Sequence, residues 1–316
     1  MRASPATVAH ADWSNHRRKR WVAVATSRPD GGWIASEPEQ TGTGAVLAQL
    51  RVADFPKPVL AGVDFPIGVP RAYAGASGIG EFNDLLSELG RGRWADVFEP
   101  AATLDEVRLE RPFFPLAPRT AGEGDKARHR DRLGLSREEV LRRCDRLARA
   151  ESLFWTVGAK QVGKAATAGW RELLLPALAD GQPSVGIWPF DDPSLEQLLR
   201  YHDVVIAETY PAALYRRVGV VFRSGQGGKT SQRARAAQAA SIGECAERLG
   251  VKLTTGLRDA IAEGFAKGQG GDDGFDAVAG LLGMLDVVAG ERPGAVPRDD
   301  AVLTTEGWML GLLPTG

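Results

Sequence analysis

Short apolar runs separated by polar turns dominate the first part of the chain and predict β-strands. Three such runs follow one another and a fourth comes after a gap, at Thr7–Ser14, Arg20–Thr26, Gly32–Ser36 and Val59–Asp64. Apolar and β-branched runs bounded by polar residues are typical of buried strands. The short links between the first three runs predict antiparallel hairpins.

A helix is predicted between the third and fourth strands, because apolar residues recur at helical spacing within Gly44–Val52. Such a helix permits a right-handed crossover, which would place Val59–Asp64 parallel to and beside Thr7–Ser14. The C-terminal ends of these two strands would then be neighbours. Asp12 and Asp64, which stand at those ends, are therefore expected to lie close together.

The middle of the chain has a different pattern. Between residues 70 and 201, Gly, Pro and Arg are frequent and strand signals are weak, so we predict a mainly helical insertion. The core would then comprise residues 1–69 and 202–316. Within the insertion, Ser136–Ser152 is predicted as one helix with a capping box and a solvated basic face, and Ala168–Leu178 as a second.

Regular signals return after the insertion. Asp203–Glu208 is predicted as a fifth strand, again ending in an acid. Helical spacing predicts further helices at Ala212–Val218, Ser231–Leu249, Leu257–Lys267 and Asp272–Ala289. The tail, Ala301–Leu313, is predicted to be a short strand or a cover over the core.

Composition narrows the class of protein. The chain has 316 residues, is 43% hydrophobic and 25% charged, and carries a net charge of −1, which is ordinary for a globular protein. The whole-chain charge therefore gives no argument for nucleic acid or an anionic membrane, although His16–Arg20 and Lys126–Arg149 are locally basic. Cys144 and Cys245 are predicted to be unpaired thiols. Without a signal-like start or a long apolar run, we expect a soluble cytoplasmic protein with no membrane span.

Acids at the strand ends are the feature that points to chemistry. They are Asp12, Asp64 and Glu208, and a late helix begins with Asp272, Asp273 and Asp276. Acids are depleted in strands, and carboxylates held close together repel and raise one another's pKa. Hard oxygen ligands of this kind are stable as anions when they hold Mg²⁺ or Mn²⁺. Two such ions about 3.5–4 Å apart can position an in-line attack on a phosphodiester.

The order of three strands, a helix and a strand, with acids on the first and fourth strands and on a late helix, resembles the ribonuclease H-like fold. Four segments resemble the DUF429 family of predicted nucleases, which have that fold: VDFPIGVP (63–70), AETYP (207–211), DDGFDAVAG (272–280) and EGWML (306–310). The resemblance extends from Asp12 to Trp308 and is least recognisable in the insertion. It implies an α/β protein with a ribonuclease H-like core and a helical insertion.

The resemblance also implies roles for the acids. Asp12 matches a first-strand residue that bridges two metal ions, and Asp64 matches the acid of the fourth strand. Asp276 matches the late-helix acid of RuvC-like resolvases, and Asp273 matches the metal-binding residue three positions earlier, on the same helix face. Glu208 matches the acid of the family's E-x-Y-P segment, to which the resemblance assigns no defined role.

Each acid also has a purely structural explanation. Asp272 and Asp273 are each compatible with an N-cap, which is the interpretation favoured for Asp272, and Asp276 is a first-turn acid that the helix dipole would favour. Asp12 and Asp64 are compatible with turn residues that follow strands. Glu208 is compatible with bracing the loop that follows it.

The segment RSGQGGKT, residues 223–230, is similar to a phosphate-binding loop, but Arg223 stands where that motif requires glycine. It is therefore interpreted as a loop in which Lys229 offers a cation. Lys229 and Arg233 are candidates for contacts with substrate phosphates, as are Lys160 and Lys164. A solvated basic loop is the alternative explanation for all four.

The sequence thus predicts a Mg²⁺- or Mn²⁺-dependent hydrolase of phosphodiester bonds, acting on nucleic acid or another phosphoester through Asp12, Asp64, Asp273 and Asp276, with Glu208 as a further candidate. Two alternatives remain open. One is an ATP-dependent phosphotransferase or ATPase of the same fold, although such proteins usually contain the core twice and no second copy is found. The other is a binding or scaffold protein without catalytic activity.

Overall fold

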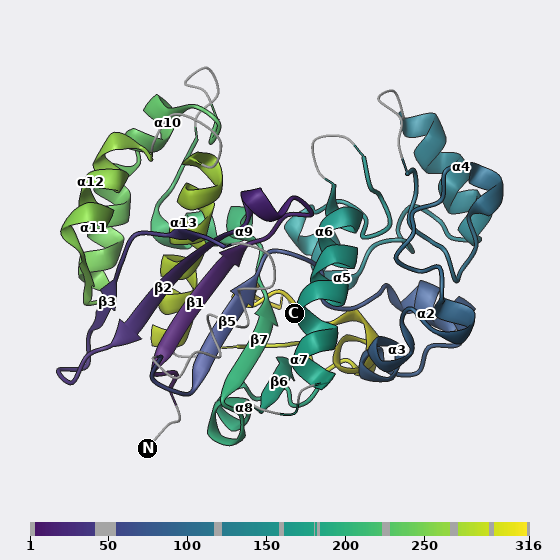
Figure 1. The fold of residues 1–316 in the computed structure, drawn as a ribbon, viewed down its shortest axis with the longest axis horizontal. Coiled ribbons are helices and arrows are strands. Elements are labelled where there is room, and N and C mark those ends of the chain that lie inside the picture. The colour runs from purple at the N-terminus through teal and green to yellow at the C-terminus, as the bar shows by residue number, and fades with distance from the viewer. Residues whose placement is uncertain are drawn as a thin grey trace. The chain divides into compact units, whose positions relative to one another are not determined.

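The computed structural model describes residues 4–41, 55–116, 122–157, 161–179, 181, 184–222, 228–265, 271–290 and 294–314. The chain divides into two compact units (Figure 1). Unit 1 comprises Met1–Asp64, Asp180–Ala295 and Met309–Gly316, and unit 2 comprises Phe65–Ala179 and Val296–Trp308.

Unit 1 is built on a mixed eight-stranded sheet. Seven strands lie in the order β6-β7-β5-β1-β2-β3-β8, and β4 pairs with β2 (Figure 1). Their bounds are β1 Thr7–Asp12, β2 Trp21–Ser27, β3 Trp33–Ala35, β4 Glu39–Gln40, β5 Val59–Val63, β6 Val185–Trp188, β7 Val204–Glu208 and β8 Val251–Leu253. The five strands predicted from the sequence are therefore present, whereas β4, β6 and β8 were not predicted. Each of these three has only two to four residues, too few for a periodic signal.

The pairing of the strands confirms the predicted arrangement around β1. This strand is antiparallel to β2 and parallel to β5, with His10 opposite Gly62 in the parallel pair. In turn, β5 is parallel to β7. Three parallel strands thus end at the same edge of the sheet, while the predicted crossover helix Gly44–Val52 lies outside the described residues.

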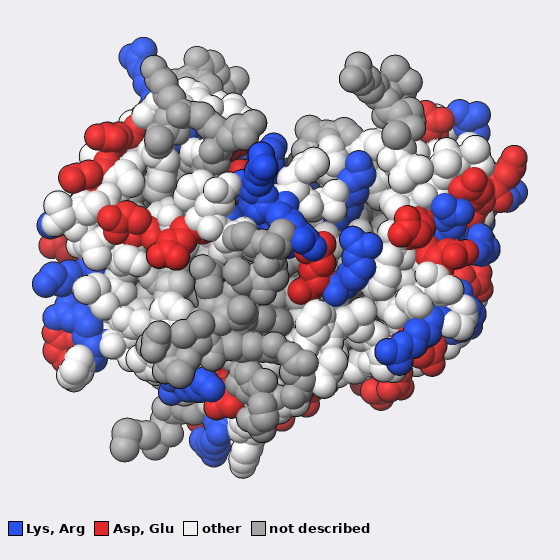
Figure 2. All heavy atoms as spheres, viewed as in Figure 1, with Lys and Arg blue, Asp and Glu red and all other residues white. Residues whose placement is uncertain are grey.

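Helices of unit 1 pack on this sheet and on one another. They are the 3-10 turn η1 Arg17–Lys19 and α8 Leu195–Tyr201, α9 Pro211–Val218, α10 Gln232–Ala236, α11 Ala239–Arg248, α12 Thr255–Glu263 and α13 Gly271–Ala289. The predicted helix Ser231–Leu249 is divided between α10 and α11, and α13 agrees with the prediction to one residue. Lys and Arg side chains gather over the tip of the β1–β2 hairpin, where η1 lies, on the face drawn in Figure 2.

The long helix α13 lies directly against the sheet at a row of small residues. Gly280 faces the fully buried ring of His10 so closely that a Cβ atom at this position would clash with the ring. His10 Nε2 lies 3.0 Å from the Thr209 hydroxyl oxygen, which holds the ring in place. On β5, a Cβ on Gly62 would lie 2.9 Å from Met284 Cε of the same helix. The close approach therefore depends on glycine at positions 62 and 280.

A first prediction concerns this contact. Gly280→Ala should lower the free energy of unfolding by about 1–3 kcal/mol, because the added methyl group overpacks a site that has no room to relax. The control is Gly243→Ala in α11, where a Cβ would meet nothing within 4 Å. That substitution should instead stabilise the protein by up to about 1 kcal/mol through helix propensity. Urea unfolding would measure both, and equal effects of the two substitutions would contradict the packing described here.

Unit 2 is mainly helical. Its helices are α2 Arg71–Ser77, α3 Phe82–Glu88, α4 Glu123–Leu133, α5 Arg143–Ala148, α6 Val162–Gly169 and α7 Leu175–Ala179, with the shorter turns η2 Gly92–Trp94, η3 Leu104–Glu106, η4 Trp170–Leu174 and η5 Val302–Glu306. Its bounds differ from the predicted insertion, residues 70–201, because β6 and α8 belong to unit 1 and residues 296–308 belong to unit 2. The predicted helix around Ala168–Leu178 corresponds to α6, η4 and α7, which follow one another without a break.

The single helix predicted over Ser136–Ser152 is wrong. The capping contacts form, since the Glu139 amide donates to Ser136 Oγ at 3.3 Å and the Ser136 amide donates to the Glu139 carboxylate at 2.8 Å. The chain then makes only a turn, and Arg142 has extended backbone angles before α5 begins. This interruption lets the Arg142 side chain enter the interior of unit 2, where it is fully buried rather than solvated.

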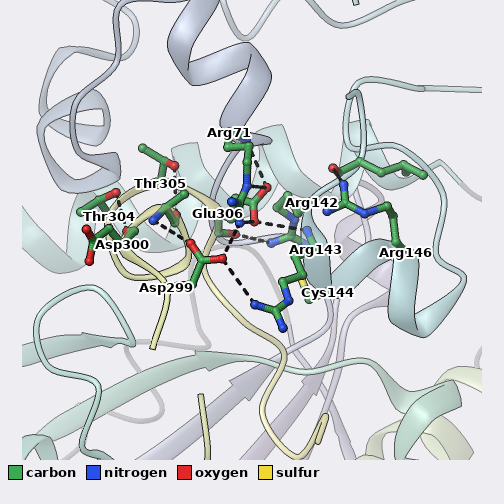
Figure 3. A network of polar contacts seen from close by, with 12 residues as sticks. Arg71, Arg142, Arg143, Cys144, Arg146, Asp299, Asp300, Thr304, Thr305 and Glu306 are labelled. Atoms are coloured by element: carbon green, nitrogen blue, oxygen red, sulfur yellow. Dashed lines mark hydrogen bonds and ion pairs between the residues drawn. The ribbon is translucent and has the colours of Figure 1, made fainter. Parts of the chain in front are cut away.

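Arg142 and Glu306 are the centre of a polar network in unit 2 (Figure 3). The Arg142 guanidinium donates to both oxygens of Asp145, at 2.7 and 3.0 Å, and to the carbonyl oxygens of Ile67 and Glu306 at 3.3 Å. The buried Glu306 carboxylate accepts bonds from Arg71 Nε and Nη2 at 3.1 and 2.9 Å. These bonds join η5 to α2 and α5, and so explain why residues 296–308 belong to unit 2.

Two further predictions can be compared with the structure. Cys144 and Cys245 are both free and buried, as expected from their sequence context. Among the described helices, none combines the length and apolar character that crossing a membrane requires.

Candidate functional site

Two of the predicted acids lie side by side at the C-terminal edge of the sheet in unit 1. Asp12 ends β1, and Asp64 follows the last residue of β5. In the parallel ladder Ala11 is opposite Val63, and the Asp64 amide donates to the Ala11 carbonyl oxygen at 3.1 Å. Asp12 and Asp64 are thus in the next row of the sheet. They share the face of His10 and Gly62, which is the face that α13 covers.

Glu208 is one position out of step with this pair. It is opposite Val63 in the ladder between β5 and β7, and its neighbour Thr209 follows in the row of Asp64. Since successive residues of a strand point to opposite faces, the Glu208 side chain is directed away from α13. Glu208 is buried at the sheet edge and its register directs it to the other face, although its charge still contributes to the raised pKa of Asp64.

Asp276 approaches this face of the sheet from helix α13, which covers it. It lies four residues before Gly280 on α13, which corresponds to about 6 Å along a helix. Asp12 lies two residues beyond His10 on β1, which corresponds to about 6.6 Å along a strand. Gly280 lies against the His10 ring. Because Asp276 and Asp12 are at similar distances along their elements from this contact, Asp276 lies over Asp12. Asp273, one turn earlier, lies at the rim.

The charges of these acids oppose one another. Burial raises the pKa of Asp12 well above its usual value, and the carboxylates of Asp276, Asp64 and Asp273 raise it further. Burial, followed by repulsion from Asp276, raises the pKa of Asp64 to about 7. The pKa of Asp273 rises to about 6, mainly through burial and the neighbouring Asp272. We call Asp12, Asp64, Asp273 and Asp276 the carboxylate cluster.

Asp276 is the member of the cluster with the most hydrogen-bond donors around it. The Tyr215 hydroxyl of α9 donates to Asp276 Oδ1, and Lys229 Nζ forms an ion pair with Oδ2. The Asp276 side chain is 2% exposed, whereas that of Lys229 is 47% exposed. Burial alone would lower the pKa of Lys229, but attraction to Asp276 outweighs it and the pKa rises. Lys229 thus supplies a positive charge to a cluster that is otherwise anionic.

This ion pair leads to a second prediction. Lys229→Met should bind Mn²⁺ more tightly than the wild type, because a divalent cation that uses both Asp276 oxygens must displace the ammonium group. The metal-free variant should lose roughly 1 kcal/mol of stability, a small amount because the lysine is half-exposed. Isothermal titration with Mn²⁺ would measure the affinity, with Lys252→Met as a control that removes an exposed lysine from β8. Affinity that is unchanged or weaker in Lys229→Met would contradict the competition.

The donors fit a hard divalent cation. All four members of the cluster offer carboxylate oxygens, which are the ligands that Mg²⁺ and Mn²⁺ prefer. Burial is the largest cause of their raised pKa values, and repulsion from neighbouring carboxylates adds to it. Within the described residues, no three members of this cluster bring one carboxylate oxygen each within 4.8 Å of one another. Holding one ion with three carboxylates would therefore require side-chain rotation, including the release of Asp276 from Lys229.

Three of the remaining predicted residues can be placed in the structure. Asp272 lies inside α13, which begins at Gly271, and so does not precede the helix as a cap would. Arg233 is exposed on α10 and Lys164 lies on α6 of unit 2, whereas Lys160 and residues 223–227 of the loop 223–230 lie outside the described residues. Tyr215 was not predicted. Its only signal in the sequence is a polar ring on the face of α9 that packs against α13.

Comparisons with known proteins add no relative. No family model, no curated protein and no solved structure matches the chain. The function is therefore inferred from the geometry and chemistry of the carboxylate cluster.

Proposed function

We propose that unit 1 is a ribonuclease H-like core and that the protein is a metal-dependent phosphodiesterase, as expected of a member of the DUF429 family. The observation that carries this proposal is the position of Asp12 and Asp64 on neighbouring parallel strands, with Asp276 over them on α13. A turn or cap explains each acid separately, but not the placement of three acids on one face. Their mutual repulsion lowers the stability of the folded protein. Destabilising charges of this kind are typical of functional sites.

We infer the role of each residue from its position. Asp12, which neighbours Asp64 on the sheet, would hold Mg²⁺ or Mn²⁺ together with Asp64, Asp273 and Asp276. A pair of such ions supplies an activated water and stabilises the leaving oxygen in phosphodiester hydrolysis. Lys229, once released from Asp276, would offer its positive charge to a phosphate bound at the cluster. Tyr215 would keep Asp276 oriented by its hydrogen bond.

The proposal is tested by incubating the full chain with Mn²⁺ and labelled DNA and RNA oligonucleotides, together with the small diester bis(p-nitrophenyl) phosphate. We expect hydrolysis that EDTA abolishes. Asp64→Asn should lower the rate by more than about 100-fold, since even partners of metal ligands are worth 10–100-fold. Asp259→Asn, an exposed acid on α12, serves as the matched control. Activity that persists in EDTA, or that is equal in both variants, would refute the proposal.

A further inference from the structure

The tip of the β1–β2 hairpin follows directly after Asp12, a member of the carboxylate cluster. Asp12 is the last residue of β1 and is opposite Trp21, the first residue of β2. The eight residues between them project beyond the sheet edge, with η1 at Arg17–Lys19. At the other side, the Trp21 ring is one of three neighbours that a Cβ on Gly274 of α13 would meet, at 3.7 Å. The tip is therefore flanked by Asp12 and by the start of α13.

The backbone of the tip is held in a defined position. Arg20 is buried, its Nε donates to the Ser14 carbonyl oxygen at 2.6 Å, and its guanidinium carbon lies 4.0 Å from the centre of the Trp13 ring. The Thr41 amide donates to the Arg20 carbonyl oxygen at 2.9 Å. The Gln40 side chain also donates to the carbonyl oxygen of Arg18. The tip is thus a braced turn, and ordering it on a ligand would cost little entropy.

Three consecutive cations project from this braced turn into solvent. Arg17, Arg18 and Lys19 are all exposed. Within the described residues, neither Arg18 nor Lys19 has a carboxylate oxygen within 4.0 Å. Lys19 stands two residues before Trp21, the residue that is opposite Asp12 across the hairpin. Arg18 and Lys19, beside the carboxylate cluster, therefore suit a ligand that is anionic along its length.

We propose that the hairpin tip Arg17–Lys19 binds the phosphate backbone of a nucleic acid strand that crosses the carboxylate cluster, so that the substrate is a polynucleotide. This inference rests on the proposed function of the cluster. A single small phosphoester at the cluster has only one or two anionic groups and would leave the tip without a ligand. A polynucleotide has an anionic group at every nucleotide, and so can contact the cluster and the tip together.

The test is binding of a fluorescein-labelled oligonucleotide of about 20 nucleotides, longer than the roughly 4–16 nucleotides of typical single-strand sites. Fluorescence anisotropy in EDTA reports binding without hydrolysis. Replacing Arg17, Arg18 and Lys19 with Gln should weaken binding at least about 10-fold at low salt. It should also make the log–log salt dependence shallower by about 2, at about 0.7 for each contact. The control replaces three exposed cations elsewhere in unit 1, namely Arg216, Lys252 and Arg258.

Two results would overturn the inference. One is wild-type affinity in the tip variant, and the other is an equal loss in the control variant, which would indicate a general charge effect. Hydrolysis by the wild-type protein separates this inference from the proposed function. If the wild type hydrolyses the small diester but the tip variant binds the oligonucleotide normally, the proposed role of the tip is refuted and the proposed phosphodiesterase activity is supported. If binding depends on the tip but the wild type hydrolyses neither substrate, the proposed role of the tip is supported and the proposed phosphodiesterase activity is refuted.

Discussion

Asp12→Asn should make the metal-free protein more stable and at the same time abolish its response to Mn²⁺. The substitution removes a buried charge that three other carboxylates repel, while it preserves the shape of the side chain. A pKa raised by one unit corresponds to about 1.4 kcal/mol, so we expect a gain of at least about that size at pH 8. A turn or cap carboxylate would instead lose about 1 kcal/mol on replacement.

The pH dependence of this gain has a defined sign. In the unfolded chain Asp12 titrates near 3.8, and in the folded protein its pKa is higher. Below 3.8 both states are protonated and the carboxyl costs nothing, whereas stability is lost as the pH rises through the folded pKa. The advantage of Asp12→Asn should therefore increase between pH 5 and pH 8. Asp259→Asn should show no such increase.

The metal response is measured on the same samples. Mn²⁺ should raise the melting temperature of the wild type, because binding to the folded state alone stabilises it. The amide of Asp12→Asn cannot bridge two ions, so its melting temperature should stay constant and phosphodiesterase activity should disappear. A rise of equal size in both proteins would exclude Asp12 as a ligand.

Arg142→Met should destabilise unit 2 by about 3–5 kcal/mol, the usual cost of removing one partner of a buried ion pair. The substitution leaves the buried Asp145 carboxylate without its guanidinium and removes the donors to the carbonyl oxygens of Ile67 and Glu306. Hydrogen exchange would report the loss as faster exchange in α5 and in η5, which this side chain joins.

Two further variants isolate the contribution of the ion pair. Arg146→Met removes an exposed arginine one turn along α5 and should cost much less, since its hydrogen bonds are to solvent-accessible carbonyl oxygens. The double variant Arg142→Met with Asp145→Leu should recover much of the lost stability, because no uncompensated charge remains. If Arg142→Met costs no more than Arg146→Met, the network does not hold unit 2 together.

The sequence predicts the sheet of unit 1 well where strands are long enough to show a pattern. β1, β2, β5 and β7 are apolar runs of five to seven residues, and the parallel position of β5 beside β1 follows from chain order. β8 has three residues and forms only because β3 offers it an edge, a tertiary effect without a local signal. The interruption at Arg142 also has a tertiary cause, since buried acceptors outweigh the helical propensity of the segment.

The candidate site was predicted only in part, because some of its features also depend on tertiary contacts. Asp12 and Asp64 follow from strand ends, and Asp276 from the spacing of the late helix. The face of Glu208 depends on a register that is fixed only when β5 and β7 pair, and one residue decides it. Lys229 was expected to face a phosphate, but its partner in the structure is Asp276, which is 47 residues away in sequence. Contacts at such separations leave no periodic trace in one sequence.

The most direct test of the metal-binding proposal is a crystal structure of the protein with Mn²⁺, read from the anomalous signal of the metal. We expect density at about 2.0–2.3 Å from carboxylate oxygens of Asp12, with Asp64 or Asp276 completing the shell and Lys229 released from Asp276. Density that is absent from Asp12 at saturating Mn²⁺, while Lys229 keeps its ion pair with Asp276, would contradict the proposal that the carboxylate cluster is a metal site.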